Sequence, residues 1–171
     1  MPAREVEQLF TVMAFEAGMS LFSAYDVSLE PTDLDTFRQN STLTLLSVIG
    51  FAGKQIAGTL VLGATREPLK RSKPSLASDR DWIAELANQL LGRIKNKILR
   101  KGIVFYAMPP AVVSGDHLAP VVSGADFRPC VFTTPGGLVC LWIELHLAGD
   151  LQPDPPADEE PIADEGDLLL F

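Results

Sequence analysis

Two side chains, Glu85 and Asn88, offer the clearest capacity for chemistry in this sequence. They are three residues apart in a segment with helical periodicity, so they are neighbours on one helix surface. The Asn carboxamide has a donor and an acceptor that can orient a water molecule, and the Glu carboxylate can bind a cation. Neither is a strong base or nucleophile in water. The pair therefore suits placing a water in line with a phosphoryl group that another molecule holds, because phosphoryl transfer depends mainly on positioning and electrostatics.

The helix predicted to carry this pair, residues 79–101, has one apolar face and one polar face. On a helical wheel, five apolar residues lie within about 60° of Ile83: Leu86, Ala87, Leu90, Ile94 and Ile98. The opposite face carries Asp81, Glu85, Asn88, Gly92 and Asn96. Asn88 and Gly92 are poor helix formers and together cost on the order of 1–2 kcal/mol relative to Ala. Residues that disfavour a helix on its solvent-facing surface indicate a functional site there.

Three further residues of the polar face, Asp81, Gly92 and Asn96, are candidate contacts with a partner molecule. Gly92 has no side chain, so another surface can come close to the helix there. Asp81 has a second interpretation, because it stands three residues after Ser78 in a helix capping box. The Glu-x-x-Asn spacing is common by chance, so the prediction depends on the whole helix face.

Other kinds of site find little support in the residue spacing. His117 and His146 lack nearby acids or cysteines at metal-binding spacings, so no metal site is predicted. Lys54 follows a glycine, but Val48 and Gln55 occupy the positions where a phosphate-binding loop needs glycine and a hydroxyl residue. The two cysteines are too few for a disulfide scaffold or a structural zinc site.

Composition and charge limit the classes of partner. The chain has 171 residues, 47% of them hydrophobic, and a net charge of −8. Eight of the 22 acidic residues lie in residues 150–171, which contain no Lys or Arg, leaving 14 acids and 14 bases in the rest. This distribution disfavours nucleic-acid binding, which needs a basic footprint. No membrane-spanning run or signal peptide is present, so a cytoplasmic location is predicted.

The order of predicted elements indicates one α+β domain, residues 1–149, followed by a disordered acidic tail with an apolar tip, residues 150–171. Helices are predicted at 4–24 and 79–101. Strands are predicted at 41–50 and 55–62 around a turn at 50–53, and at 103–107, 111–114, 127–134 and 138–147. Residues 64–77 are predicted as a loop, and 115–126 as irregular. Linkers this short favour a largely antiparallel sheet with the two long helices packed on it.

The last two strands form a predicted hairpin around residues 135–137. Cys130 and Cys140 are symmetric about Pro135, so they are predicted to face each other across it. We interpret them as small buried hydrophobic residues, since a disulfide is disfavoured in a reducing cytoplasm. Both faces of the hairpin are apolar, which places it under helices or in a subunit interface.

The sequence from Asp81 to Asn96 resembles the signature helix of the CheC/CheX chemotaxis phosphatases. Their pattern is Asp or Ser, three residues, Glu, two residues, Asn, and then a proline somewhat over twenty residues later. Residues 49–63 resemble the family's strand pair, and the resemblance extends over roughly residues 5–147. Pro109 and Pro110 come slightly early for the family's proline. The single copy of the motif resembles the CheX branch, because CheC has two.

The resemblance implies a CheC/CheX-like fold and hydrolysis of the aspartyl phosphate on a phosphorylated CheY-type response regulator. It implies that Glu85 pairs with the regulator's lysine and that Asn88 orients the attacking water. The regulator supplies the Mg²⁺, so no cofactor is expected in this chain. The resemblance also implies a homodimer joined through the sheet.

A second interpretation of the same fold is a non-catalytic protein, either a regulator-binding adaptor or a module like those of the flagellar switch. An adaptor has no need to retain Asn88, so its presence favours the enzyme. The acidic tail lies outside the family pattern, and it is either a tethered docking peptide or a solubilising appendage.

Overall fold

The computed structural model describes residues 1–35, 43–118 and 129–151. In chain order the elements are α1 (Ala3–Ser23), β1 (Glu30–Thr32), β2 (Leu43–Ala52), β3 (Ile56–Ala64), α3 (Arg66–Ser72), α4 (Asp79–Leu99), β4 (Tyr106–Ala107), β5 (Ala111–Leu118), β6 (Cys130–Thr134) and β7 (Gly137–Leu147). The parts of the predicted elements at 41–42, 119–128 and 152–171 lie outside the described residues.

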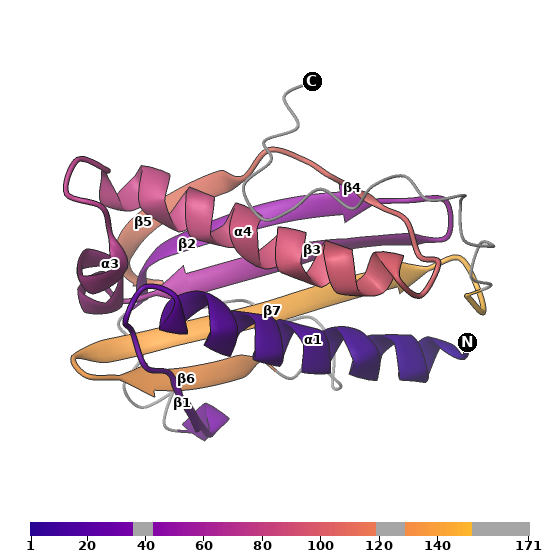
Figure 1. Cartoon of the computed structure of the whole chain (residues 1–171), viewed down its shortest axis with the longest axis horizontal. Helices are drawn as coiled ribbons and strands as arrows, with labels where there is room; N and C mark the ends of the chain where they lie inside the picture. Colours follow the sequence, from indigo (N-terminus) through magenta and orange to yellow (C-terminus); the bar gives the residue numbers. More distant parts are fainter. Residues whose placement is uncertain (36–42, 119–128, 152–171) are drawn as a thin grey trace.

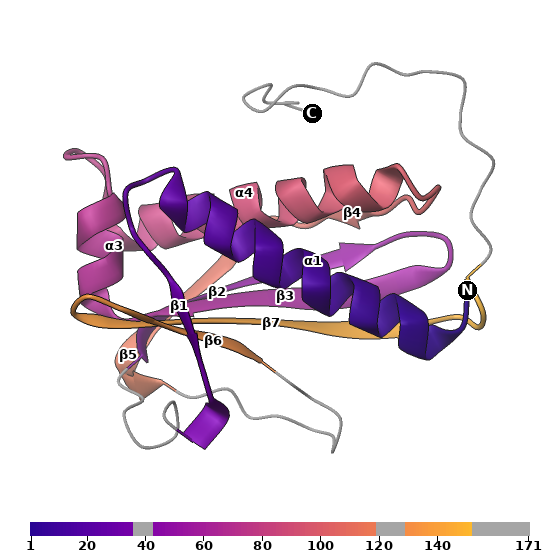
Figure 2. The same cartoon turned by 60° about the horizontal axis from the view of Figure 1, so that its bottom comes forward.

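The strands form one antiparallel sheet in the order β1-β6-β7-β3-β2-β4, with β5 also pairing with β2. Helices α1 and α4 run side by side across one face of this sheet (Figures 1 and 2). We call the opposite face the outer face. The predicted α+β class and the antiparallel sheet with two long helices are confirmed.

The core lies between the two long helices and the sheet. Apolar residues recur along α1 and α4 near the helical period, and the buried ones point at the strands. Three aromatic rings from different elements meet there, Phe10 of α1, Phe51 of β2 and Phe105 before β4. All three are essentially buried. This packing fixes α4 on the sheet and so sets which of its residues face outward.

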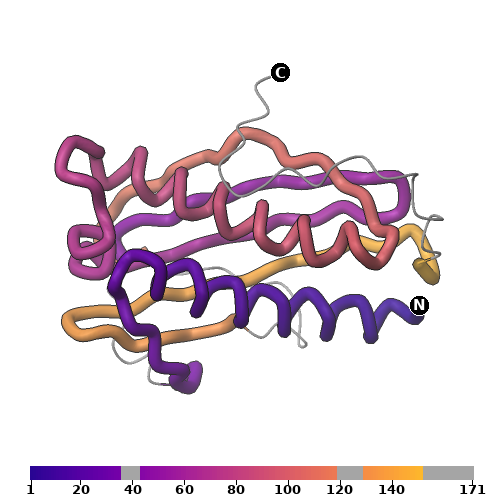
Figure 3. Tube along the Cα trace, in the orientation of Figure 1, coloured from indigo at the N-terminus to yellow at the C-terminus, as the bar shows by residue number. Residues whose placement is uncertain are grey.

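The two ends of the described chain meet beside the first turn of α1. The backbone of Leu151 donates to the carbonyl of Met1 at 3.0 Å, and the Met1 ammonium donates back to Leu151. Leu151 is buried in the core. Figure 3 shows the start of the chain next to the end of β7. The core therefore includes the second residue of the segment predicted as a tail.

The predicted loop 64–77 is wrong, because Arg66–Ser72 forms the helix α3. Arg, Lys and Pro dominate its sequence, but Leu69 is fully buried and Pro68 stands in the first turn, where proline is tolerated. The helix buries Pro68, Leu69 and Ser72 against the rest of the protein, although its composition is typical of a polar loop.

Three strand boundaries also differ from the prediction. β2 continues through the predicted turn 50–53, because Gly50 pairs with Thr59, and the chain reverses after Ala52. Residues 103–107 contribute only Tyr106–Ala107 to the sheet, and Ile103 and Phe105 are buried in the core. β5 runs on to Leu118, so the predicted irregular segment begins within a strand, but residues 115–117 have no partner in the register and His117 has a φ of +56°.

The hairpin is confirmed, but its predicted register is wrong by one residue. Val131 pairs with Cys140, and Cys130 pairs with Leu141. Because neighbouring side chains in a strand point to opposite faces, the two cysteines lie on different faces of the sheet. Phe132 consequently packs in the helix-covered core, whereas Cys140 belongs to a second cluster with Leu43, Val131 and Leu138.

Candidate functional site

Helix α4 begins at a side-chain cap. The Ser78 hydroxyl accepts a hydrogen bond from the Asp81 backbone N–H at 3.1 Å and donates to the Asp81 carboxylate at 2.6 Å. Ser78 therefore satisfies one of the backbone donors at the start of the helix, and Asp81 complements the positive end of the helix dipole. The capping interpretation of Asp81 accounts for its position, while its side chain stays exposed.

The predicted burial of α4 is confirmed along its length. The residues of the apolar stripe are all fully buried: Ile83, Leu86, Ala87, Leu90, Ile94 and Ile98. On the opposite face Asp81, Glu85 and Asn88 are exposed, and Gly92 and Asn96 are half-buried. The structure thus brings the five candidate residues together along one face of a single rigid helix. We call this surface the α4 face.

Two flanking elements border the α4 face. On one side lies α1, which α4 meets through Arg93 donating to the Ser20 hydroxyl at 2.7 Å and Lys97 paired with Glu16 at 2.8 Å. On the other side lies the sheet edge, where Arg80 donates to the Ser114 hydroxyl at 2.6 Å. These contacts hold α4 from both sides and leave the α4 face between them.

Glu85 and Asn88 differ in their surroundings, although both are exposed. The Glu85 carboxylate accepts a hydrogen bond from the Gln89 amide at 2.8 Å. The Gln89 amide oxygen in turn accepts from the Tyr25 hydroxyl at 2.9 Å. Asn88 has no side-chain hydrogen bond to any residue within the described ranges, so both ends of its amide are available to water or a partner.

Gln89 and Tyr25 are the residues of this site that sequence reasoning missed. Gln89 carried a usable signal, because it stands four residues after Glu85, where helix side chains meet. Tyr25 carried none, since it reaches the site from 64 positions away along the chain, just beyond α1. Only the antiparallel packing of α1 on α4 brings its hydroxyl to Gln89.

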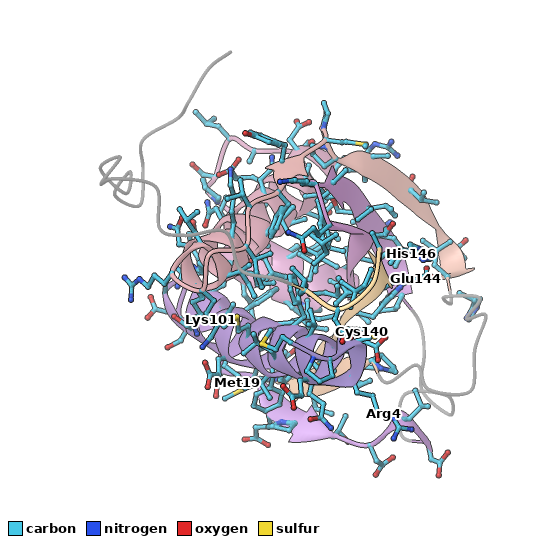
Figure 4. All side chains as sticks on the ribbon, turned by 90° about the vertical axis from the view of Figure 1, so that its right-hand side faces the viewer. Arg4, Met19, Lys101, Cys140, Glu144 and His146 are labelled. Carbon is cyan, nitrogen blue, oxygen red and sulfur yellow. The ribbon has the colours of Figure 1, made fainter. Side chains whose placement is uncertain are left out.

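Metal ligation finds no support in the described part of the chain. No group of three His, Cys, Asp or Glu side chains gathers there in a way that would hold a metal ion. His146 has Glu144 at 3.8 Å, and both side chains project from β7 on the exposed outer side (Figure 4). Among the helices in those same ranges, none is long and apolar enough to cross a membrane.

The sequence matches no family model, and no curated protein matches it. Solved structures match the fold over most of the chain. The chemotaxis protein CheX from Vibrio vulnificus has a TM-score of 0.68 at 18% identity, over 80% of this chain and 99% of that chain. This chain has the CheX fold. A chain of the CheX-CheY-BeF3-Mg+2 complex from Borrelia burgdorferi has a TM-score of 0.56 at 17% identity, over 81% of this chain and 96% of that one.

The CheX fold is not confined to proteins of that name. The middle domain of FliM from H. pylori matches with a TM-score of 0.51 at 11% identity, over 82% of this chain and 88% of that chain. Fold likeness at these identities does not distinguish one function from another. The function of this chain must therefore be argued from the α4 face itself.

Proposed function

We propose that this chain is a phosphatase that hydrolyses the aspartyl phosphate of a CheY-type response regulator in the cytoplasm. The observation that carries the proposal is the exposed pair of Glu85 and Asn88, side by side on one rigid helix in a chain with the CheX fold. The Borrelia burgdorferi structure is a complex of CheX with CheY, which supports the choice of partner.

In the proposed reaction the regulator docks on the α4 face with its active-site lysine against the Glu85 carboxylate. The Asn88 amide then holds a water in line with the phosphorus atom. The water oxygen bonds to phosphorus, the bond from phosphorus to the aspartyl oxygen breaks, and the regulator's carboxylate and inorganic phosphate leave. The regulator supplies the Mg²⁺ that neutralises the phosphoryl oxygens, so this chain contributes positioning alone.

Asp81, Gly92 and Asn96 complete the proposed docking surface. They extend the α4 face on both sides of the catalytic pair. Gly92 has no side chain, and the space in front of it is open, because a Cβ built at this position would meet no atom within 4 Å. A second surface can therefore approach α4 closely one turn after Asn88.

We also propose that two copies of this chain associate through the outer face of the sheet. Val48, Val61 and Trp142 form one row across β2, β3 and β7 in the strand register. On the same face, beside Leu46, Val113 of β5 is 46% exposed. Val61 is already buried, whereas Val48 and Trp142 are half-buried, and an apolar sheet face that stays partly exposed is typical of a subunit interface.

The alternative is a non-catalytic protein of the same fold, either a regulator-binding adaptor or a module like those of the flagellar switch, and the FliM middle domain shares this fold. The adaptor and the phosphatase both predict binding to the regulator, so turnover separates them.

The test is phosphate release from a phosphorylated CheY-type regulator, with and without this protein. We expect wild type to accelerate release and Asn88→Ala to reduce that acceleration by roughly 100-fold. Binding to the regulator loaded with BeF3 and Mg²⁺ should be retained by Asn88→Ala. Gln8→Ala, which removes an exposed amide from α1, is the matched control and should leave release unchanged. Tight binding with no acceleration by wild type would instead identify the non-catalytic module.

A further inference from the structure

A continuous chain of hydrogen bonds leads from beyond the end of α1 to the Glu85 carboxylate. The Tyr25 hydroxyl donates to Gln89 Oε1 at 2.9 Å, and Gln89 Nε2 donates to Glu85 Oε1 at 2.8 Å. The first bond is partly buried and the second is exposed. We call these three side chains the Tyr25 relay.

The chemistry of the three groups fixes the direction of the relay. An ionised Glu85 carboxylate can only accept hydrogen bonds, so the Gln89 amide must present its NH₂ to it. The amide oxygen then faces Tyr25, whose hydroxyl must donate. Each group in the relay therefore has one orientation, because reversing the amide would place its oxygen against the Glu85 carboxylate and reversing the hydroxyl would place its oxygen against the amide oxygen, in each case two acceptors.

The inner end of the relay is anchored in the core. The Tyr25 ring meets Trp82 edge to face, with centroids 4.9 Å apart and planes at 88°. The buried Trp82 indole N–H donates to the Ser72 hydroxyl at 2.8 Å, which ties α4 to α3. These contacts hold the Tyr25 side chain in place, and its hydroxyl is therefore fixed in position.

We infer that Gln89 is the positioning residue for Glu85 and that Tyr25 orients Gln89 for that task. The inference rests on the proposed function, since it concerns how Glu85 is presented to the regulator. An exposed Glu samples several rotamers, and ordering it on binding lowers affinity. Holding Oε1 on Gln89 restricts these rotamers in advance and leaves Oε2 to accept from the regulator's lysine.

The test uses the full chain and a regulator loaded with BeF3 and Mg²⁺, so that binding is measured without turnover. Gln89→Met keeps the side-chain length but removes the amide, and Tyr25→Phe keeps the ring contact with Trp82 but removes the hydroxyl. We expect each to weaken binding roughly 3- to 10-fold. Lys97→Met is the matched control, because it removes the ion pair between Lys97 of α4 and Glu16 of α1, which does not involve Glu85. Its Kd should equal that of wild type.

A double-variant comparison separates positioning from a general effect on the fold. If Gln89 acts through Glu85, Gln89→Met should have no further effect in a Glu85→Ala background. An equal loss in both backgrounds would overturn the inference, as would wild-type affinity in Gln89→Met when Glu85→Ala weakens binding. The proposed role of Glu85 is tested separately, by whether Glu85→Ala alone weakens binding.

A measurement on the free protein keeps the inference testable if Glu85→Ala binds as wild type does and the proposed role of Glu85 fails. The relay predicts that the Gln89 side-chain amide is rigid in ¹⁵N relaxation and becomes mobile in Tyr25→Phe. An amide in wild type that is as mobile as that of Gln8 would show that the relay does not hold, whatever the regulator does.

Discussion

Gly92 stands one helical turn after Asn88 on α4, and a Cβ at Gly92 would have no heavy atom within 4 Å. The protein's own structure therefore gives no steric reason for glycine at this position, where φ lies in the helical range. Glycine in a helix costs roughly 0.5–1 kcal/mol relative to alanine. This unfavourable glycine lies on the surface where we propose that the regulator docks.

Gly92 therefore separates folding from docking. Gly92→Ala should raise the free energy of unfolding by about 0.5–1 kcal/mol, as measured by urea denaturation. Gly92→Gln should fold normally but weaken binding of the BeF3-loaded regulator by about 10-fold or more, because the added side chain blocks close approach. Wild-type affinity in Gly92→Gln would remove Gly92 from the proposed docking surface.

Two buried serines should respond oppositely to removal of their hydroxyl groups. Ser47 on β2 is fully buried, and its hydroxyl has no hydrogen-bond partner within the described ranges. Ser72 is also buried, but its hydroxyl accepts from the Trp82 indole at 2.8 Å. We expect Ser47→Ala to be neutral or stabilising by up to about 1 kcal/mol, and Ser72→Ala to be destabilising by about 1–3 kcal/mol.

Thermal and urea denaturation of both variants check this prediction, each variant serving as the control for the other. The two variants should differ in stability because the Trp82 indole loses its hydrogen-bond acceptor in Ser72→Ala. Equal losses of stability in the two variants would mean that Ser47 has a partner after all.

The α4 face could be predicted from sequence because it depends on local order. The helical period alone separates the buried stripe from the exposed side, and the Ser78 cap fixes the start of the helix. The Tyr25 relay could not be predicted, because it depends on the packing of α1 against α4. Helical spacing indicates the Gln89–Glu85 contact, but no periodicity indicates which distant residue completes it.

The hairpin shows a different limit of sequence reasoning. Symmetry about Pro135 predicts that Cys130 faces Cys140, whereas the turn places Val131 there. A shift of one residue is small in sequence but transfers every β6 side chain to the other face of the sheet. Register is fixed by turn geometry and by the fit of Phe132 into the helix-covered core, neither of which a residue count contains.

The surroundings of Cys140 predict a loss of stability at high pH. Burial, with a smaller contribution from Cys130, raises the pKa of Cys140 from 9.0 to about 12. Below pH 9 the thiol is protonated in both the folded and the unfolded chain, and its contribution is constant. Between pH 9 and 12 the unfolded chain loses this proton first, so the free energy of unfolding falls as the pH rises, by on the order of 1 kcal/mol per pH unit.

Urea denaturation between pH 8 and 11 measures this effect. Lysines and tyrosines also titrate in this range, so the informative quantity is the difference from Cys140→Ala, which lacks the thiol. The variant should lose stability with pH less steeply than wild type. Parallel curves for the two proteins would contradict the prediction.

A charge on the outer face of the sheet should disrupt association without unfolding the chain. Val113 is 46% exposed on β5, within the face that we propose for the dimer. Val113→Lys places a charge in that interface and should convert a dimer to a monomer, measured by sedimentation or light scattering. Val12→Lys is the matched control, because Val12 is 54% exposed but lies on α1, on the other side of the sheet. A wild-type protein that sediments as a monomer, or a dimer that both variants leave intact, would exclude association through this face.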